Sequence, residues 1–546
     1  MDDRSYAYDP VSTGSPVIHD TRNMEAGQLW RQYVIAGIAN IAIATTGYSM
    51  GWTSPVNEKL EDLEQSPLGV EITSNQSSWI GSLLTIGAIF GPFLGGFAAS
   101  KVGRKWGLLT TIVPLLVGWI LIGVAQNIAM IYAGRVFWGL AVGMLFTITP
   151  MYCAEIATDD VRGALGSFLQ VFITVGFLLV YAIGPFVSYN VITYVGVAFV
   201  TVFAVTFFWM PESPTYHLLK NDPHAAGECL ATIRGKSRAG VQGELDKMQA
   251  DVSASMAKTA TIADVFRGGN FKAFYISCAL VTFQQFSGIN AVLFYMSNIF
   301  TAAQSTLEPA IATIIIGSIQ VVASLITPLV VDRLGRRLLL LVSSCGTAVG
   351  LGLLGMYFIL DKNQNPIVES IRILPIIALI LFIVTYCWGL GPLPWAVMGE
   401  LFPIEVKAIA SPIATAYCWG LSFLRAACVA AISLEDRYRP MSGQHERRGL
   451  CSAVDVFRLV MMMTLYFQPI AEAVGMGVAF LIFAVCCVIS FFFTLFLVPE
   501  TKGKSFNEIQ DMLSSRRLIV CCEYTNFFFV KIYSVEAQQN GNIQII

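Results

Sequence analysis

The sequence is short of charged residues and histidines, and its cysteines follow no spacing typical of a metal site or a disulfide framework. Asp, Glu, Lys and Arg make up 13% of the 546 residues, about half the share found in ordinary soluble proteins. Most of the 12 cysteines lie inside apolar runs, where a small packing role is expected. The chain also lacks a nucleophile–base pair, a phosphate-binding loop and a cluster of metal ligands. We therefore expect no enzyme activity, no catalytic or metal site and no cofactor.

Apolar residues are abundant and are arranged in long runs. They make up 55% of the chain, and the mean hydropathy is +0.64. Between residues 33 and 498 we count about twelve runs of roughly 20 mostly apolar residues, the length of a helix that spans a bilayer. The runs predict an all-α membrane protein with twelve transmembrane helices. No short apolar run with a small-residue cleavage site precedes the first span, so no signal peptide is expected.

The charges at the ends of these runs form a pattern that occurs twice. A Gly-Arg-basic triplet, an acid–base pair seven residues apart and a Pro-Glu-hydroxyl triplet appear in each half of the chain. A duplicated six-helix unit predicts two lobes, with a substrate site between them near the middle of the membrane. The paired motifs are Gly103-Arg104-Lys105 with Gly335-Arg336-Arg337, Glu155 and Arg162 with Glu400 and Lys407, and Pro211-Glu212-Ser213 with Pro499-Glu500-Thr501.

Basic residues cluster at alternate loops, and the loops between them carry few. The positive-inside rule therefore places both termini in the cytoplasm. The loop at residues 54–76 then faces outside, where Asn75 begins an Asn-Gln-Ser glycosylation pattern; an unused triplet close to the membrane is an equal alternative. The predicted segments are a cytoplasmic tail (1–31), an N-terminal six-helix lobe (32–210), a cytoplasmic helical linker (211–271), a C-terminal six-helix lobe (272–498) and a cytoplasmic tail (499–546).

Residues 425–463 interrupt the second lobe. Ten charged residues lie in this segment, and at about 2.5–3.5 kcal/mol for each charge at mid-membrane the cost is on the order of 25 kcal/mol. The segment is therefore predicted to be a polar insertion that loops out of the lipid and breaks helix 11 after Leu424. The tail after residue 518 is apolar but contains Glu523 and Lys531, so it is a poor span. Alternative splicing or an error in the gene model would explain both segments.

Further short motifs follow one another in a specific order: Gly96–Lys105, Pro150-Met151-Tyr152 with Glu155, Arg162-Gly163, Pro211–Pro214, Gln284–Asn290, Asp332–Arg337, Gly391–Trp395 and Pro499–Gly503. Over most of residues 33–505 this order resembles the sugar porters of the major facilitator superfamily. The chain looks most like the insect facilitated trehalose transporters and next most like the animal facilitative glucose transporters. The resemblance implies the major facilitator fold and transport of a sugar by alternating access.

The resemblance places the sugar contacts on seven residues: Gln170, Gln284, Gln285, Asn290, Gln320, Trp395 and Trp419. Their chemistry suits a neutral sugar, because amides both donate and accept hydrogen bonds and aromatic rings cover the apolar faces of a sugar. Gln285 and Asn290 lie about 140° apart on a continuous helix, so an unwound helix at Ser287-Gly288 is needed to turn both into one cavity. The alternatives are hydrogen bonds between helices for the amides, and packing or interfacial anchoring for the tryptophans.

Three positions depart from the usual residues of the family. Gln320 stands where glucose transporters usually have asparagine, Cys418 replaces an asparagine seen in some relatives, and Cys387 replaces a glutamate. The first change bears on the size of the substrate, and the other two make the cavity less polar. Arg135 is a separate candidate, in the outer half of the fourth apolar run. It is expected either to snorkel outward or to organise an outer gate.

The resemblance also implies a set of cytoplasmic gate salt bridges. Ion pairs at the inner rim would hold that side shut and break when the rim opens, each contributing about 1 kcal/mol or less when half exposed. Positive-inside anchoring alone is the alternative. Ser100 and Thr215 depart from the family pattern and predict a weaker latch in the first lobe. The set is Arg104, Glu155, Arg162 and Glu212 in the first lobe and Asp332, Arg336, Arg337, Glu400, Lys407 and Glu500 in the second.

Proton coupling is not expected. Proton-coupled relatives carry an aspartate one residue after Gly-Tyr in the first span, where this chain has Ser49, and none of the 4 histidines lies in a span. With no acid at membrane depth to carry a proton, the sequence predicts a uniporter. The resemblance to the insect transporters favours trehalose as its substrate. A glucose or hexose uniporter, a proton-coupled symporter, a sugar sensor and a non-functional isoform are the alternatives. We expect a monomer in the plasma membrane, with endosomal or lysosomal membrane as the alternative, and no nucleic-acid partner.

Overall fold

The fold is seen in a computed structural model that describes most of the chain between residues 27 and 514. The tail before residue 27, Lys407, the predicted insertion at 425–463 and the tail after 514 lie outside the described residues, as do the side chains of Asn75 and Asp332. The described residues are 27–158, 160–256, 261–294, 296, 299–300, 308–402, 406, 409–422, 476–502, 504 and 506–514.

The N-terminal lobe is a bundle of long helices with apolar interiors. Its central helix is α6, which packs against α1, α3 and α5, and its buried residues extend along most of its length. The helices of this lobe are α1 (Leu29–Gly51), α2 (Thr53–Glu61), α3 (Ser74–Lys101), α4 (Arg104–Thr110), α5 (Ile112–Gly123), α6 (Ile128–Ile156), α7 (Arg162–Ile183) and α8 (Tyr189–Phe208).

The C-terminal lobe is built from the second set of helices, with α17 packed against both α19 and α24. Residues 409–422 are also helical. The short terminal helix α25 packs against α13 and α20 at the end of the lobe. The helices are α13 (Gly268–Phe286), α14 (Ile289–Phe294), α16 (Pro309–Leu334), α17 (Arg336–Lys362), α18 (Ile367–Ser370), α19 (Leu374–Trp388), α20 (Leu393–Leu401), α24 (Met476–Leu497) and α25 (Phe506–Ser514).

Within the described part of the chain, 10 helices are long and apolar enough to cross a membrane. Two of the twelve predicted spans are not among them. The seventh is divided into α13 and α14 at Ser287-Gly288, where Gly288 has φ = +78°, a conformation that glycine adopts without steric cost. The unwound helix expected at this point is therefore confirmed. The eleventh span begins in the helix at 409–422, and its continuation lies outside the described residues.

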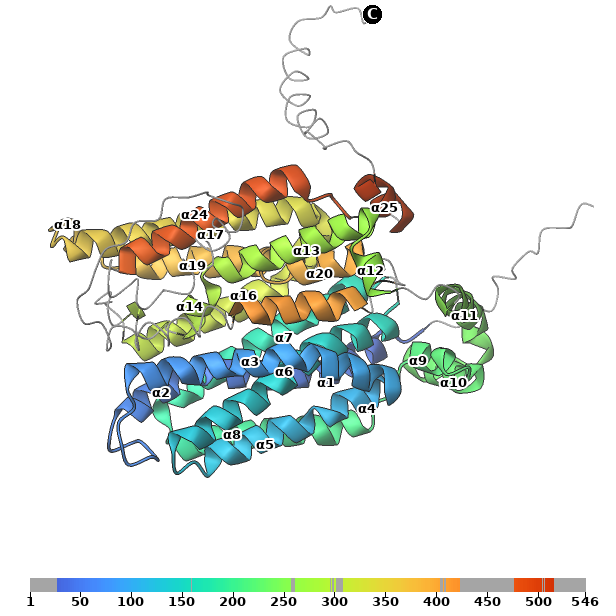
Figure 1. The fold of residues 1–546 in the computed structure, drawn as a ribbon, viewed down its shortest axis with the longest axis horizontal. Helices are drawn as coiled ribbons and strands as arrows, with labels where there is room; N and C mark the ends of the chain where they lie inside the picture. Colours follow the sequence, from blue (N-terminus) through green and yellow to red (C-terminus); the bar gives the residue numbers. More distant parts are fainter. Residues whose placement is uncertain are drawn as a thin grey trace, which may run out of the picture.

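The two lobes lie side by side with their long helices running in similar directions (Figure 1). They meet where α7 of the first lobe packs against α16 of the second. Tyr181 at the end of α7 also joins them, since its hydroxyl donates a hydrogen bond to the Leu293 carbonyl of α14 (2.7 Å). The described interface between the lobes therefore includes α7, α14 and α16.

The linker forms a small helical unit at one end of the N-terminal lobe (Figure 1). Arg234 anchors it: the side chain is 4% exposed, donates to the Ile156 carbonyl at the end of α6 (2.6 Å) and pairs with Glu244 (2.7 Å). The linker helices are α9 (Pro214–Leu219), α10 (Pro223–Arg234), α11 (Gln242–Met256) and α12 (Ile262–Val265). The first three of these helices share a core of Leu218, Ala226, Leu230, Val241 and Leu245, whereas α12 packs against α13 of the second lobe.

Candidate functional site

Three of the predicted amides lie at the break between α13 and α14. The Gln284 amide donates a hydrogen bond to the carbonyl of Gly391 (2.6 Å), in the turn between α19 and α20. Asn290, just after the break, donates to the side-chain oxygen of Gln285 (2.6 Å). A continuous helix would hold Gln285 and Asn290 about 140° apart. The break at Gly288 is therefore what allows these two amides to touch.

Gln285 is held at both ends of its amide group. Its nitrogen donates to the Cys418 sulfur (3.1 Å), and its oxygen also accepts a hydrogen bond from the Ser422 hydroxyl (2.8 Å). Cys418 and Ser422 are four residues apart in the helix at 409–422, so they lie on one face of it. Sequence reasoning misses Ser422, although its spacing from Cys418 was the available signal.

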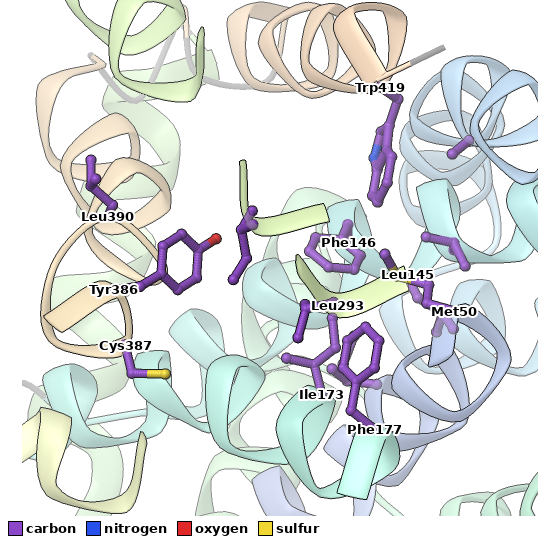
Figure 2. Close-up of a cluster of buried hydrophobic side chains, with 14 of the residues drawn as sticks. Met50, Leu145, Phe146, Ile173, Phe177, Leu293, Tyr386, Cys387, Leu390 and Trp419 are labelled. Atoms are coloured by element: carbon purple, nitrogen blue, oxygen red, sulfur yellow. The ribbon is translucent and has the colours of Figure 1, made fainter. Parts of the chain in front are cut away.

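An aromatic contact joins the two lobes. Phe146 of α6 lies between two tryptophans of the second lobe, with its ring centroid 5.8 Å from Trp395 and 5.4 Å from Trp419, which it meets edge to face. Figure 2 shows Phe146 and Trp419 in the same apolar cluster as Leu293. Sequence reasoning misses Phe146 because a phenylalanine inside an apolar run carries no distinguishing signal. Both predicted tryptophans thus contact the opposite lobe directly.

Two of the predicted sugar contacts carry a buried polar atom with no hydrogen-bond partner among the described residues: the side-chain oxygen of Gln320 and Nε1 of Trp419. Burying such a group unpaired costs about 1–3 kcal/mol, so a bound hydroxyl or water would be stabilised at each. Gln170 approaches from the first lobe: a Cβ added to Gly391 would lie 3.5 Å from its side-chain amide carbon. Gln170 and Gln284 therefore reach the Gly391 turn from opposite lobes.

The gate residues of the first lobe form one cluster. Arg104 pairs with Glu155 (2.8 Å) through two guanidinium nitrogens, and the two side chains are 8% and 15% exposed. Glu212 accepts hydrogen bonds from the backbone nitrogens of Arg104 and Lys105 (both 2.9 Å). The Ser213 hydroxyl donates to Glu155. Each acid of this cluster is therefore satisfied by donors from its own lobe.

The second lobe repeats this arrangement. Arg336 pairs with Glu400 (3.0 Å), with side chains 16% and 29% exposed. Glu500 accepts from the backbone nitrogens of Arg336 and Arg337 (both 3.0 Å), and the Thr501 hydroxyl donates to Glu400 (2.5 Å). The duplicated sequence motifs thus fold into the same contact pattern twice. All of these bonds join elements of a single lobe.

Gly103 and Gly335 make this pattern possible, because a Cβ at either position would collide with the carboxylate of Glu212 or Glu500. Next to the first cluster, the Cys229 thiol of α10 donates to the Glu212 carbonyl (2.6 Å). Burial, and then the Glu212 charge, raises the pKa of Cys229 to about 12, so the thiol stays protonated at neutral pH. The other predicted gate residues are Arg162, at the start of α7, and Asp332 and Lys407, whose side chains lie outside the described residues.

Arg135 is completely buried in the first lobe and does not snorkel to the surface. Its guanidinium donates to the carbonyls of Ile80 on α3 (2.8 Å) and Ser49 on α1 (2.7 Å). It also lies 5.8 Å from the ring centroid of Trp52 and 5.5 Å from that of Trp138. Among the described residues its Nη2 atom has no acceptor. Arg135 therefore ties α1, α3 and α6 together through carbonyls and rings.

Comparison with known sequences gives a single family. The family model described as "Sugar (and other) transporter" matches residues 24–436 and 450–513. The interruption at 437–449 lies within the segment predicted to be an insertion. The chain is 31% identical over 491 residues to the facilitated trehalose transporter Tret1 of Anopheles gambiae, covering 89% of this chain and 56% of that protein. It is 29% identical over 507 residues to Tret1 of Apis mellifera ligustica, covering 92% of each.

Solved structures with the same fold are also found. The proton:xylose symporter XylE bound to 6-bromo-6-deoxy-D-glucose superposes with a TM-score of 0.71 at 21% identity, covering 89% of this chain and 99% of XylE. An inward-open form of XylE from E. coli gives a TM-score of 0.63 over 88% of this chain. These similarities confirm the predicted major facilitator fold.

Proposed function

This chain belongs to the sugar (and other) transporter family, and from that premise we propose that it carries a neutral sugar across a membrane by alternating access. The strongest support is the group of amides at the break between α13 and α14: Gln284, Gln285 and Asn290. With Gln170 on the opposite lobe they offer several donors and acceptors and no charge. That chemistry fits an uncharged, hydroxyl-rich solute.

Two contacts between the lobes flank these amides. We assign the end with the linker helices to the cytoplasm, following the positive-inside rule. The Tyr181–Leu293 hydrogen bond then lies toward the outside, and the contact of Phe146 with Trp395 lies toward the inside. Rocking of the lobes would break one contact while the other stays closed, which exposes the amides to one side at a time.

We propose trehalose as the substrate, with glucose or another hexose as the alternative. The support is the set of relatives, 29–31% identical, that are named facilitated trehalose transporters. Uptake of labelled trehalose and labelled glucose by oocytes expressing the full chain tests this. We expect saturable trehalose uptake that unlabelled trehalose inhibits. Saturable glucose uptake without trehalose uptake would replace trehalose by a hexose.

We further propose facilitated diffusion without proton coupling. Arg135 uses its guanidinium on backbone carbonyls, including that of Ser49, and forms no ion pair among the described residues. Among the described residues, no carboxylate pairs with Arg135 that could take up and release a proton. Sugar uptake should therefore be unchanged by a proton uncoupler. Accumulation above the external concentration that collapses with the uncoupler would indicate a symporter.

The charged clusters are proposed to fasten the cytoplasmic helix ends of each lobe, so that each lobe moves as one body between its inward and outward states. We also propose that the protein is a monomer in the plasma membrane with both termini in the cytoplasm and a glycan on Asn75. Endoglycosidase treatment and surface labelling of cells test the last two points.

A sensor or a non-functional isoform remains the main rival, because of the insertion at 425–463. Deleting these residues and comparing sugar uptake with that of the full chain separates the possibilities. Equal uptake by both forms identifies the insertion as a tolerated loop. Uptake by the deletion form alone identifies the full chain as inactive.

A further inference from the structure

We propose that the cytoplasmic end of α4 and α8 binds the headgroup of an anionic phospholipid. The site is a strip of cations and exposed aromatic rings on the outer side of the first lobe. It is named the inner strip here and consists of Lys101, Lys105, Trp106, Phe208, Trp209 and Lys220. The proposal rests on the cytoplasmic assignment of this end and on no assumption about the transported sugar.

Lys105 is the centre of the inner strip. Its ammonium lies 5.7 Å from the ring centroid of Trp106 and 5.6 Å from that of Phe208. Those two rings meet edge to face at 6.2 Å. In the described part of the chain the Lys105 ammonium forms no ion pair, and its cation is held over aromatic faces only. An ammonium placed in this way can still bind an anion.

Three aromatic rings of the strip are at least half exposed. Trp106 is 50%, Phe208 51% and Trp209 78% exposed. Trp106 belongs to α4 and Phe208 to α8, two helices that run along the part of the first lobe away from the second lobe (Figure 1). On a membrane protein this edge faces lipid, and tryptophan at the end of a span marks the headgroup level. The strip therefore lies where a phospholipid glycerol and phosphate would be.

Two further cations of the strip, Lys101 and Lys220, are linked through Tyr216. The Lys220 ammonium lies 5.6 Å from the Tyr216 ring centroid, and the Tyr216 hydroxyl donates to the Lys101 carbonyl (3.1 Å). Both lysines are exposed. The nearby acid, Glu212, is turned inward to backbone nitrogens. The strip thus presents three positive charges toward the cytoplasmic leaflet, where anionic lipids are concentrated and each basic residue strengthens binding.

The second lobe provides an internal comparison. It keeps the gate geometry, but its basic residue at the equivalent position, Arg337, turns its guanidinium into the protein and donates to the Leu495 carbonyl (2.5 Å). The free cation over two rings is therefore not required by the shared gate motif. The equivalents of Lys105, Trp106, Phe208 and Trp209 are Arg337, Leu338, Phe496 and Leu497. This difference between the lobes is what assigns a separate role to the inner strip.

The test measures lipid binding directly, without sugar. The purified full chain, in nanodiscs of phosphatidylcholine, is compared with the same chain in nanodiscs containing about 20% phosphatidylserine, by native mass spectrometry of retained lipid and by the thermal unfolding midpoint. We expect phosphatidylserine to be retained selectively and to raise the midpoint. Lys105→Gln should weaken retention about fivefold, and the effect should shrink as salt is raised.

Matched variants keep the proposal falsifiable. Phe208→Leu should weaken retention, whereas Phe496→Leu, at the equivalent position of the second lobe, should not. The proposal would be overturned if the unmodified chain retained both lipids equally. It would also be overturned if Lys105→Gln retained as much phosphatidylserine as the unmodified chain. A rise of the midpoint with inorganic phosphate as large as the rise with phosphatidylserine would overturn it too, since a lipid would then not be needed. If Lys105→Gln does not fold, the two phenylalanine variants decide.

Discussion

The ion-pair clusters of the two lobes differ in burial, and this difference predicts unequal contributions to stability. Arg104 and Glu155 are 8% and 15% exposed, whereas Arg336 and Glu400 are 16% and 29% exposed. Removing one partner of a buried pair costs about 3–5 kcal/mol, because the other charge stays buried. A partly exposed pair contributes about 1 kcal/mol or less. We therefore expect Arg104→Met to lower the free energy of unfolding by about 3 kcal/mol and Arg336→Met by about 1 kcal/mol.

The assay is thermal unfolding of the purified protein in detergent, followed by tryptophan fluorescence. A loss of 1 kcal/mol corresponds to about 2–4 °C for a unit of the size of one lobe. Arg104→Met should thus lower the midpoint by about 6–12 °C and Arg336→Met by about 2–4 °C. Arg372→Met is the control, because Arg372 lies 3.6 Å from Glu369 with both side chains exposed, and no shift is expected.

Equal shifts for the two variants, or a larger shift for Arg336→Met, would refute the argument from burial. The expected order also differs from the one suggested by Ser100 and Thr215 in the sequence. Those two residues predict a weaker first-lobe latch, but neither is needed for the Arg104–Glu155 contact, which the Ser213 hydroxyl supports as well. The deeper burial of that pair argues for the stronger cluster in the first lobe.

Three other predictions follow from particular contacts. Ser49→Asp places a carboxylate next to Arg135, which has an unused donor, so sugar uptake should become dependent on external pH; uptake that stays independent of pH would count against it. Ser422→Ala removes one of the bonds that orient Gln285, so KM should rise about tenfold with kcat little changed; an unchanged KM would exclude this positioning role. Gly288→Ala, at φ = +78°, should lower the free energy of unfolding by about 1–2 kcal/mol and the unfolding midpoint by several °C; an unchanged midpoint would show that the break tolerates a side chain.

The charge motifs were the part of the structure most open to prediction from sequence. The triplet at Gly103 and its counterpart at Gly335 occur at matching places in the two halves, and both fold into the same contacts with Glu212 and Glu500. The break at Gly288 could also be predicted, because two amides on opposite faces of a helix cannot share a cavity. In each case local spacing was the signal, although the gate role of the charges was implied only by the family resemblance.

Contacts between distant helices could not be predicted in this way. Phe146 looks like any apolar residue until the tryptophans of the other lobe are placed on either side of it. For Arg135 the sequence left snorkelling and an outer-gate role open, and only the positions of the Ser49 and Ile80 carbonyls show that the side chain is held inside the lobe. Such pairings depend on how the lobes and their helices pack, which the spacing within one helix does not contain.

The most direct test of the central claim is sugar exchange by the purified chain in liposomes, compared between the unmodified protein and Gln284→Ala. The account predicts saturable exchange of a labelled neutral saccharide that weakens at least tenfold when Gln284 is truncated, because the amide at the α13–α14 break is lost from the site. Folded protein that exchanges no saccharide, or that exchanges one equally well without the Gln284 amide, would contradict it.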